Sequence, residues 1–121
     1  MSLQHLHLHV RDRSRAEHFY TSWFGMNVQR RGSEITFMTD EREFLFALMD
    51  DAAPAPMPPW FHFGFRMASA ATVLAMNERM LDAGVGIRKP LYQDDSLVSN
   101  RCADPDGYVI EVYWEAEPTG A

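Results

Sequence analysis

The sequence predicts an α+β protein made of two modules, each with the element order β-α-β-β(-β). Each half of the chain begins with an alternating strand and continues into a helical stretch. A connector with four prolines over 51–59 separates the halves. Corresponding residues also recur at a nearly constant offset, 57 positions from His5 to His62 and 59 from Gly25 to Gly84. Because one module is too small to bury its own core well, we expect the two helices to cover one face of a shared, mostly antiparallel sheet.

The length of the chain suits a single domain, which we expect over 1–121. Within it we expect module one over about 3–50, the proline-rich connector over 51–59 and module two over about 60–116. Apolar residues make up 46% of the chain and charged residues 23%, which is typical of a globular protein and not of a disordered one.

Charge and hydropathy exclude several classes of partner. The net charge is −6, and nucleic-acid binding needs clustered Lys and Arg, so we expect no nucleic-acid partner. No apolar run approaches the roughly 20 residues of a membrane-spanning helix, so we expect no membrane segment. Cys102 is the single cysteine, so no disulfide can form within the chain. We therefore expect a reducing compartment, the cytoplasm.

The opening strand, over 4–10, alternates apolar residues with histidines. Successive side chains of a strand point to opposite faces, so its apolar residues share one face. The other face carries His5, His7 and His9. Two interpretations stay open for this face. It is either a solvent-facing surface or part of a functional cavity that uses imidazole as a metal ligand or proton carrier.

A helix and a hairpin follow in module one. The helix is expected over 14–24, because Asp12 suits its N-cap and Gly25 its C-terminal end. Two alternating segments, 34–39 and 43–49, flank a polar turn and are predicted to form a hairpin.

Module two repeats this order. Residues 60–66 alternate as a strand, with His62 on the face opposite three phenylalanines. A helix is expected over 69–83, ending at Gly84. The remaining strands are expected over 97–102 and 108–115, joined by the Asp-Pro-Asp-Gly turn at 104–107.

The last predicted strand contains a carboxylate among residues that otherwise suit packing. The apolar set of the last strand is Tyr108, Ile110, Val112 and Trp114, which leaves Glu111 on the other face. A carboxylate there costs free energy unless it is paired or bound to a cation. If the apolar faces meet the helices, Glu111 shares a face with His5 and His62. Two histidines and one glutamate form a facial metal site with open positions for water or substrate.

Two motifs stand at the ends of the chain. They are His5-x-x-Leu8-x-Val10-x-Asp12, followed by Phe19-Tyr20 and Phe24-Gly25, and Asp104-Pro105-Asp106-Gly107-Tyr108-x-x-Glu111. Both resemble motifs of the vicinal oxygen chelate superfamily, which includes glyoxalases, extradiol dioxygenases, fosfomycin-resistance enzymes and bleomycin-binding proteins. The resemblance covers essentially the whole chain, and it implies βαβββ modules in a mixed, mostly antiparallel curved sheet with helices on the convex face.

Carried over by position, the resemblance implies that His5, His62 and Glu111 hold a divalent metal ion, with Fe, Mn, Zn and Ni all open. It implies that His7 transfers a proton or contacts an oxyanion, whereas His9 is expected at the cavity rim. The expected partner is a small oxygen-bearing metabolite on which the ion acts as a Lewis acid. Lyase, isomerase and dioxygenase chemistry all remain open.

Departures from the family pattern leave a second function open. Glyoxalases of the superfamily usually supply a fourth ligand, a glutamate from the first module's last strand, where this chain has Ala47. Binding members of the superfamily carry no metal, so the alternative is a protein that sequesters a small molecule or antibiotic without chemistry. We also expect a homodimer, because the resemblance implies cavities completed across chains and because long strand edges would otherwise stay open.

Overall fold

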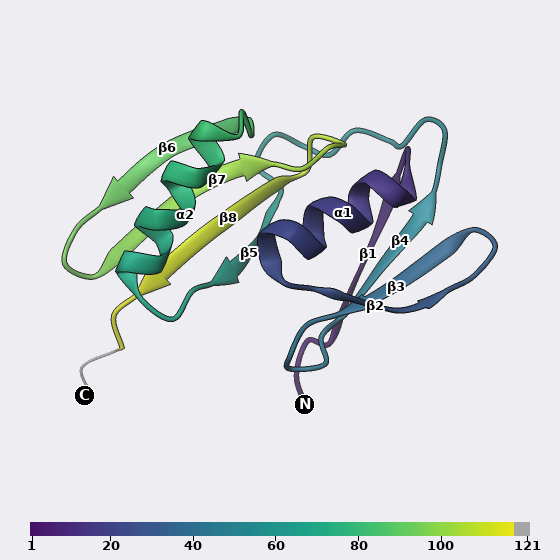
Figure 1. Ribbon diagram of the computed structural model, residues 1–121, viewed down its shortest axis with the longest axis horizontal. Coiled ribbons are helices and arrows are strands. Elements are labelled where there is room, and N and C mark those ends of the chain that lie inside the picture. Colours follow the sequence, from purple (N-terminus) through teal and green to yellow (C-terminus); the bar gives the residue numbers. More distant parts are fainter. Residues whose placement is uncertain (118–121) are drawn as a thin grey trace. The chain divides into compact units, whose positions relative to one another are not determined.

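Each half of the chain forms a four-stranded mixed sheet with one helix on it (Figure 1). The computed structural model describes residues 1–117. It divides into two compact units, unit 1 over Met1–Pro56 and unit 2 from Met57 onward. The division therefore falls inside the proline-rich segment 51–59.

Both units have the predicted order βαβββ. In each sheet the first and last strands of the unit are parallel neighbours, and the other neighbouring strands are antiparallel. Unit 1 contains β1 (His5–Val10), α1 (Arg13–Phe24), β2 (Asn27–Arg31), β3 (Ile35–Thr39) and β4 (Leu45–Asp50), with sheet order β1-β4-β3-β2. Unit 2 contains β5 (His62–Arg66), α2 (Ala70–Asp82), β6 (Ile87–Gln93), β7 (Leu97–Ala103) and β8 (Val109–Glu115), with sheet order β5-β8-β7-β6.

The alternation predicted for the opening strand is confirmed in β1. Leu8 and Val10 are buried, whereas the three histidines are exposed on the other face. α1 packs against β3 and β4. The N-cap prediction is also confirmed, because the Asp12 side chain accepts a hydrogen bond from the Arg15 backbone amide at 3.1 Å. Gly25 ends α1 with a φ of +66°, a left-handed conformation that favours glycine.

α2 begins after Ser69, whose hydroxyl accepts from the Thr72 amide at 3.2 Å. Its buried stripe contains Val73, Met76 and Met80, as the spacing predicts. Leu81 is apolar but does not belong to this stripe, because its side chain is 57% exposed. Counted from Val73, the stripe has Met76 at i+3, Asn77 at i+4 and Met80 at i+7, and Asn77 is buried although it is polar. Within residues 1–117 no helix is both long and apolar enough to span a membrane.

The sequence predicts no residue range for two of the strands, β2 and β6. Both are edge strands, and most of their residues are exposed. Alternation is weak where neither face is buried, and Pro90 inside β6 is tolerated because an edge strand has one side without a ladder.

A carboxylate in α1 ties the helix to its sheet. Glu17 is 9% exposed, and its Oε1 accepts from Arg31 Nε and Nη2 at 3.0 and 2.8 Å. Its Oε2 accepts from the hydroxyl of the buried Thr36 at 2.7 Å. Burial works to raise the pKa of Glu17, but the hydrogen bonds from Arg31 and Thr36 and the nearby positive charges outweigh it and lower the pKa.

We expect Glu17→Gln to destabilise the chain by about 1–2 kcal/mol at neutral pH, a modest loss because the Arg31 side chain is 63% exposed. Since the pKa of the carboxyl is lowered on folding, its contribution is present above the unfolded pKa and disappears as pH falls through the folded value. Urea unfolding at pH 7 and at pH 3 measures both effects. Glu34→Gln, at an exposed position nearby, is the control; equal stability of both variants at pH 7 would contradict the expectation.

The β6–β7 turn is organised by one aspartate. Asp94 Oδ2 accepts from the Tyr92 hydroxyl at 2.5 Å, and its Oδ1 accepts from the amides of Ser96 and Leu97, each at 2.8 Å. The Tyr92 hydroxyl first, and then these amides, lower the pKa of Asp94 from 3.8 to about 2.

Asp94→Asn is therefore expected to loosen the turn at neutral pH and to matter less in acid. The charged carboxylate stabilises the turn above its ordinary pKa of 3.8, and this contribution is lost as pH falls towards about 2. Amide hydrogen exchange at Leu97 checks this. At pH 7 exchange should be faster in Asp94→Asn than in the parent, and the difference should shrink near pH 2. Asp95→Asn, at an exposed neighbour, should leave exchange unchanged.

The single cysteine is buried in the core of unit 2. Cys102 lies on β7 and is 0% exposed. Burial first, and then the charge of Asp104, raise the pKa of the thiol to about 12. The thiolate form is therefore scarce at neutral pH, and Cys102 is a packing residue.

Candidate metal-binding face

The last strand of unit 2 presents two different faces. Ile110 and Val112 are fully buried, and α2 packs on β7 and β8. Asn100 of β7 donates to Asn77 of α2 at 2.8 Å, which identifies the face of the sheet that meets the helix. The alternate residues point to the other face, which we call the face opposite α2. By strand register it contains His62, Gly64, Arg66, Ser99, Arg101, Val109, Glu111 and Tyr113.

Two of the three predicted metal ligands meet on the face opposite α2. His62 Nε2 lies 3.8 Å from Glu111 Oε1. His62 Nδ1 lies 3.1 Å from the backbone carbonyl oxygen of Trp60, which can only accept, so Nδ1 carries the proton and donates. In the neutral ring Nε2 then has a lone pair, and this lone pair is on the side of the carboxylate. At 3.8 Å no direct hydrogen bond joins Nε2 to Glu111.

These two donors fit a divalent cation. Bonds from a metal ion to histidine nitrogen or carboxylate oxygen are about 2.0–2.2 Å long, so one ion can bond to two atoms up to about 4 Å apart. The two side chains are only 32% and 23% exposed, which reduces competition from water. The carbonyl of Trp60 holds the imidazole in the tautomer and orientation that metal binding requires.

The third predicted ligand, His5, lies in unit 1, on the exposed face of β1. Within residues 1–117 no group of three or more His, Cys, Asp and Glu side chains is close enough together to hold a metal ion. Within unit 2 the structure thus brings together His62 and Glu111, whereas His5 belongs to unit 1.

Strand register relates the two units residue by residue. In unit 2 Gly64 pairs with Glu111, two residues after His62. In unit 1 His7 pairs with Ala47, two residues after His5. Ala47 therefore occupies the register position of Glu111, and its methyl group cannot ligate a metal. Unit 1 has a histidine where unit 2 has a glycine, and an alanine where unit 2 has the carboxylate.

The other two histidines of β1 differ in their contacts. His9 Nδ1 lies 2.9 Å from Asp51 Oδ2, and this hydrogen bond is the main cause that lowers the pKa of Asp51. The ring of His7 lies 5.1 Å from that of His9, centroid to centroid, and the two rings are steeply inclined. Both side chains are exposed. His9 is therefore engaged by a carboxylate, whereas the contact of His7 is with a ring.

A buried aspartate positions the start of β8. Asp104 is 4% exposed, and its Oδ1 accepts from the amides of Asp106 and Tyr108, each at 2.9 Å. Gly107 has a φ of +89°, which favours glycine at the end of the turn. The predicted turn over 104–107 is confirmed. It leads directly into the strand that carries Glu111.

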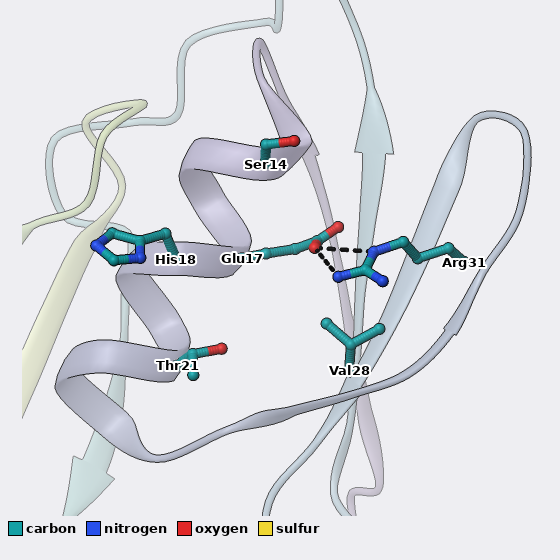
Figure 2. A pocket seen from close by; sticks show the side chains of 6 residues that line it. All are labelled: Ser14, Glu17, His18, Thr21, Val28 and Arg31. Carbon is teal, nitrogen blue, oxygen red and sulfur yellow. Dashed lines mark hydrogen bonds and ion pairs between the residues drawn. The ribbon is translucent and has the colours of Figure 1, made fainter.

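Unit 1 also has a shallow hollow of about 340 Å³ between α1 and β2 (Figure 2). Figure 2 shows Glu17 pointing towards Arg31, so the two opposite charges satisfy each other. His18 points to the other side of the helix and is exposed, as its position in the sequence suggests. The hollow is lined by Ser14, Glu17, His18, Thr21, Val28 and Arg31. We interpret it as the rim of the structural contact between helix and hairpin.

The family model of the Glyoxalase/Bleomycin resistance protein/Dioxygenase superfamily matches residues 2–112. The chain belongs to this superfamily. No curated protein matches the chain in sequence. The resemblance in the two motifs, from His5 to Asp12 and from Asp104 to Glu111, is therefore confirmed at the level of the superfamily.

Solved structures of this superfamily have the same fold. A possible glyoxalase from Bacillus cereus is 29% identical, with a TM-score of 0.80 over 93% of this chain and 97% of that one. The fosfomycin resistance protein FosX from Listeria monocytogenes is 20% identical, with a TM-score of 0.81 over 96% and 94%. A lactoylglutathione lyase from Agrobacterium tumefaciens is 20% identical, with a TM-score of 0.74 over 93% and 92%. At 20% identity the last two establish the fold alone.

Sequence reasoning missed two groups on the candidate face. The carbonyl of Trp60 orients His62, but a backbone group leaves no signal in residue identity. Arg101 pairs with Glu111 in the β7–β8 register. Its signal was present in the alternation of β7, where Arg101 is the one charged residue between buried neighbours.

Proposed function

We propose that this protein is a small metal-dependent enzyme of the vicinal oxygen chelate type. In this proposal His62 and Glu111, joined by His5, hold a divalent ion beside a small oxygen-bearing metabolite. The ion supplies Lewis-acid stabilisation of negative charge that develops on the metabolite's oxygens. The observation that carries the proposal is the pairing of His62 Nε2 with Glu111 Oε1 at 3.8 Å, with Nδ1 of the same ring on the Trp60 carbonyl.

The chain's own groups divide the work. Glu111 contributes negative charge, and the neutral His62 contributes a lone pair that the Trp60 carbonyl keeps oriented. His7 is proposed to take up or deliver a proton, because imidazole is the side chain best suited to proton transfer at neutral pH. Ala47 leaves unit 1 without a matching carboxylate, which favours lyase, isomerase or dioxygenase chemistry other than that of a four-ligand glyoxalase. The single, buried cysteine supports a reducing compartment such as the cytoplasm.

Metal titration of the purified chain tests this proposal. The metal-stripped protein is titrated with Mn²⁺, Fe²⁺, Zn²⁺ and Ni²⁺ in turn, and we expect one equivalent of at least one ion to bind. His62→Ala and His5→Ala should weaken that binding, and His9→Ala, at the residue paired with Asp51, is the matched control. If no ion binds, and His5→Ala changes neither stability nor ligand binding, the enzyme proposal fails. A metal-loaded protein is next screened with catechols and 2-oxoaldehydes.

One observation favours a second candidate, a binding protein without chemistry. Trp60 is 74% exposed and directly precedes the strand that carries His62, so it offers an apolar platform for an aromatic ligand. In that case ligand binding would quench Trp60 fluorescence and would be unaffected by metal removal or by Glu111→Gln. Loss of the quenching in metal-stripped protein would instead support the enzyme.

We also propose a homodimer that shares its sites between chains. The observation behind it is that β1 and β5 are edge strands of their sheets. Sedimentation of the full chain should give twice the monomer mass. Mixing His5→Ala with Glu111→Gln protein tests the sharing, because a mixed dimer with shared sites contains one intact set of ligands. Recovery of metal binding supports shared sites, and a strict monomer would rule them out.

A further inference from the structure

On the face opposite α2, the guanidinium of Arg101 has a buried nitrogen without a hydrogen-bond acceptor in the described part of the chain. This nitrogen is Nε. A buried N–H without an acceptor costs free energy and is rare in native structures. Arg101 and Glu111 are register partners, yet within residues 1–117 no ion pair joins them, and the carboxylate of Glu111 lies beside His62 instead.

A second cation stands beside it. Lys89 of β6 pairs with Arg101 of β7, so the two positive side chains are directly opposite each other on the same face. Like charges in this position destabilise a sheet unless something negative lies between them. Arg66, another cation of this face, differs because it already donates to Glu115 Oε1 at 3.1 Å.

We infer that Arg101, assisted by Lys89, binds an anionic group of the substrate next to the His62–Glu111 pair. The planar guanidinium presents parallel N–H groups that match a carboxylate or phosphate, and Nε is one of them. Four register partners thus form a row across the sheet. The row begins with two cations on β6 and β7, continues with a carboxylate on β8 and ends with a glycine on β5; these residues are Lys89, Arg101, Glu111 and Gly64.

Gly64 is the position at the other end of the row. A Cβ there would lie 3.1 Å from both the Glu111 carbonyl oxygen and the Tyr113 ring, so a side chain would require these groups to shift. This inference rests on the proposed function for the role of Glu111, and it narrows the substrate class. The substrate is a compact metabolite that carries a carboxylate, phosphate or phosphonate beside its neutral oxygens. Uncharged 2-oxoaldehydes would offer Arg101 carbonyl oxygens but no negative charge.

The test uses the full chain in metal-stripped form, with the Arg101 Nε–H signal followed by ¹⁵N NMR. Pyruvate and inorganic phosphate are the anionic probes, and methyl pyruvate is the uncharged analogue of the first. Ionic strength is held constant with chloride. We expect the Arg101 signal to shift and saturate with at least one anion and to stay in place with methyl pyruvate. If neither anion moves it, with or without added Zn²⁺, which is diamagnetic, the inference is overturned.

Two substitutions separate the guanidinium from simple charge. Arg101→Lys keeps the charge but loses Nε and the planar fork, so anion affinity should fall by about tenfold or more. Arg101→Gln should abolish binding. Arg88→Gln is the matched control, because Arg88 is an exposed cation of β6 whose guanidinium lies near Gly107. Equal affinity of Arg101→Lys and the parent, with both folded by circular dichroism, would overturn the role of the fork.

Metal binding is measured on the same variants, so the two proposals fail separately. Arg101→Lys should keep Mn²⁺ binding while it loses anion affinity. If the parent binds anions through Arg101 but binds no metal, the anion site stands and the proposed enzyme function falls. If it binds Mn²⁺ but Arg101→Gln binds anions as well as the parent does, the anion site falls and the metal site stands.

Discussion

Glu111→Gln is expected to weaken Mn²⁺ binding by about a hundredfold or more, since loss of groups that only support a metal ligand already costs about 10–100-fold. The amide has nearly the same volume but carries no charge, and its NH₂ can donate to His62 Nε2 in place of the ion. Isothermal titration of the metal-stripped chain with Mn²⁺ measures the change. The free energy of unfolding should change little, because the one ionic neighbour of Glu111 within residues 1–117 is His62, at 3.8 Å.

Glu115→Gln is the matched control for this change. Glu115 lies on the same strand and, by alternation, on the same face, but its carboxylate accepts from Arg66 at 3.1 Å. Its substitution removes the same charge four residues away and should change Mn²⁺ affinity by less than about threefold, as expected for a screened charge. Equal losses in both variants would mean that the ion responds to the general charge of the strand, which would contradict a ligand role for Glu111.

Asp104→Ala is expected to destabilise the chain by about 2–4 kcal/mol, because it leaves two amides near the start of β8 without their acceptor. These amides belong to Asp106 and Tyr108, and Tyr108 is 6% exposed. Urea unfolding measures the loss. Metal affinity should also fall in the folded variant, since the turn leads into the strand that carries Glu111.

Two comparisons sharpen this expectation. Asp104→Asn keeps an oxygen that can accept and should recover part of the stability. Asp95→Ala alters an exposed aspartate in another turn of unit 2 and should change stability by less than about 0.5 kcal/mol. Asp104→Ala that unfolds like the parent would show that the 104–107 turn forms without the side chain.

The parts of the fold that could be predicted from the sequence have one face in the core. β1 and β8 alternate cleanly because α1 and α2 bury one side of each sheet, and burial selects apolar residues at every second position. The cap at Asp12 was recognisable because a short polar side chain has a local partner three residues on. The Asp-Pro-Asp-Gly turn was recognisable for the same local reason.

The parts that could not be predicted depend on partners far along the chain. β2 and β6 are edge strands with little buried surface, so their sequences carry weak periodicity. Asn77 is buried in α2 because Asn100, 23 residues away, donates to it, and a lone asparagine in a helix gives no hint of this. The lysine–arginine pair on β6 and β7 became visible only from the strand register, which a bulged edge strand hides in the sequence.

For the candidate site the residue types were predictable and their pairing only in part. His62 and Glu111 were expected on one face from alternation, and the structure brings them to 3.8 Å. The tautomer of His62 depends on the carbonyl of Trp60, a backbone atom that residue identity does not describe. His5 belongs to unit 1, whereas His62 and Glu111 belong to unit 2, and its role as a ligand stays a prediction.

Anomalous diffraction from crystals of the full chain grown with Mn²⁺ tests the central claim most directly. The account predicts an anomalous peak about 2.0–2.3 Å from both His62 Nε2 and a carboxylate oxygen of Glu111. It also predicts that His62 Nδ1 still donates to the Trp60 carbonyl. Saturating Mn²⁺ with no peak between these two atoms, and a direct hydrogen bond from Nε2 to Glu111 in its place, would contradict it.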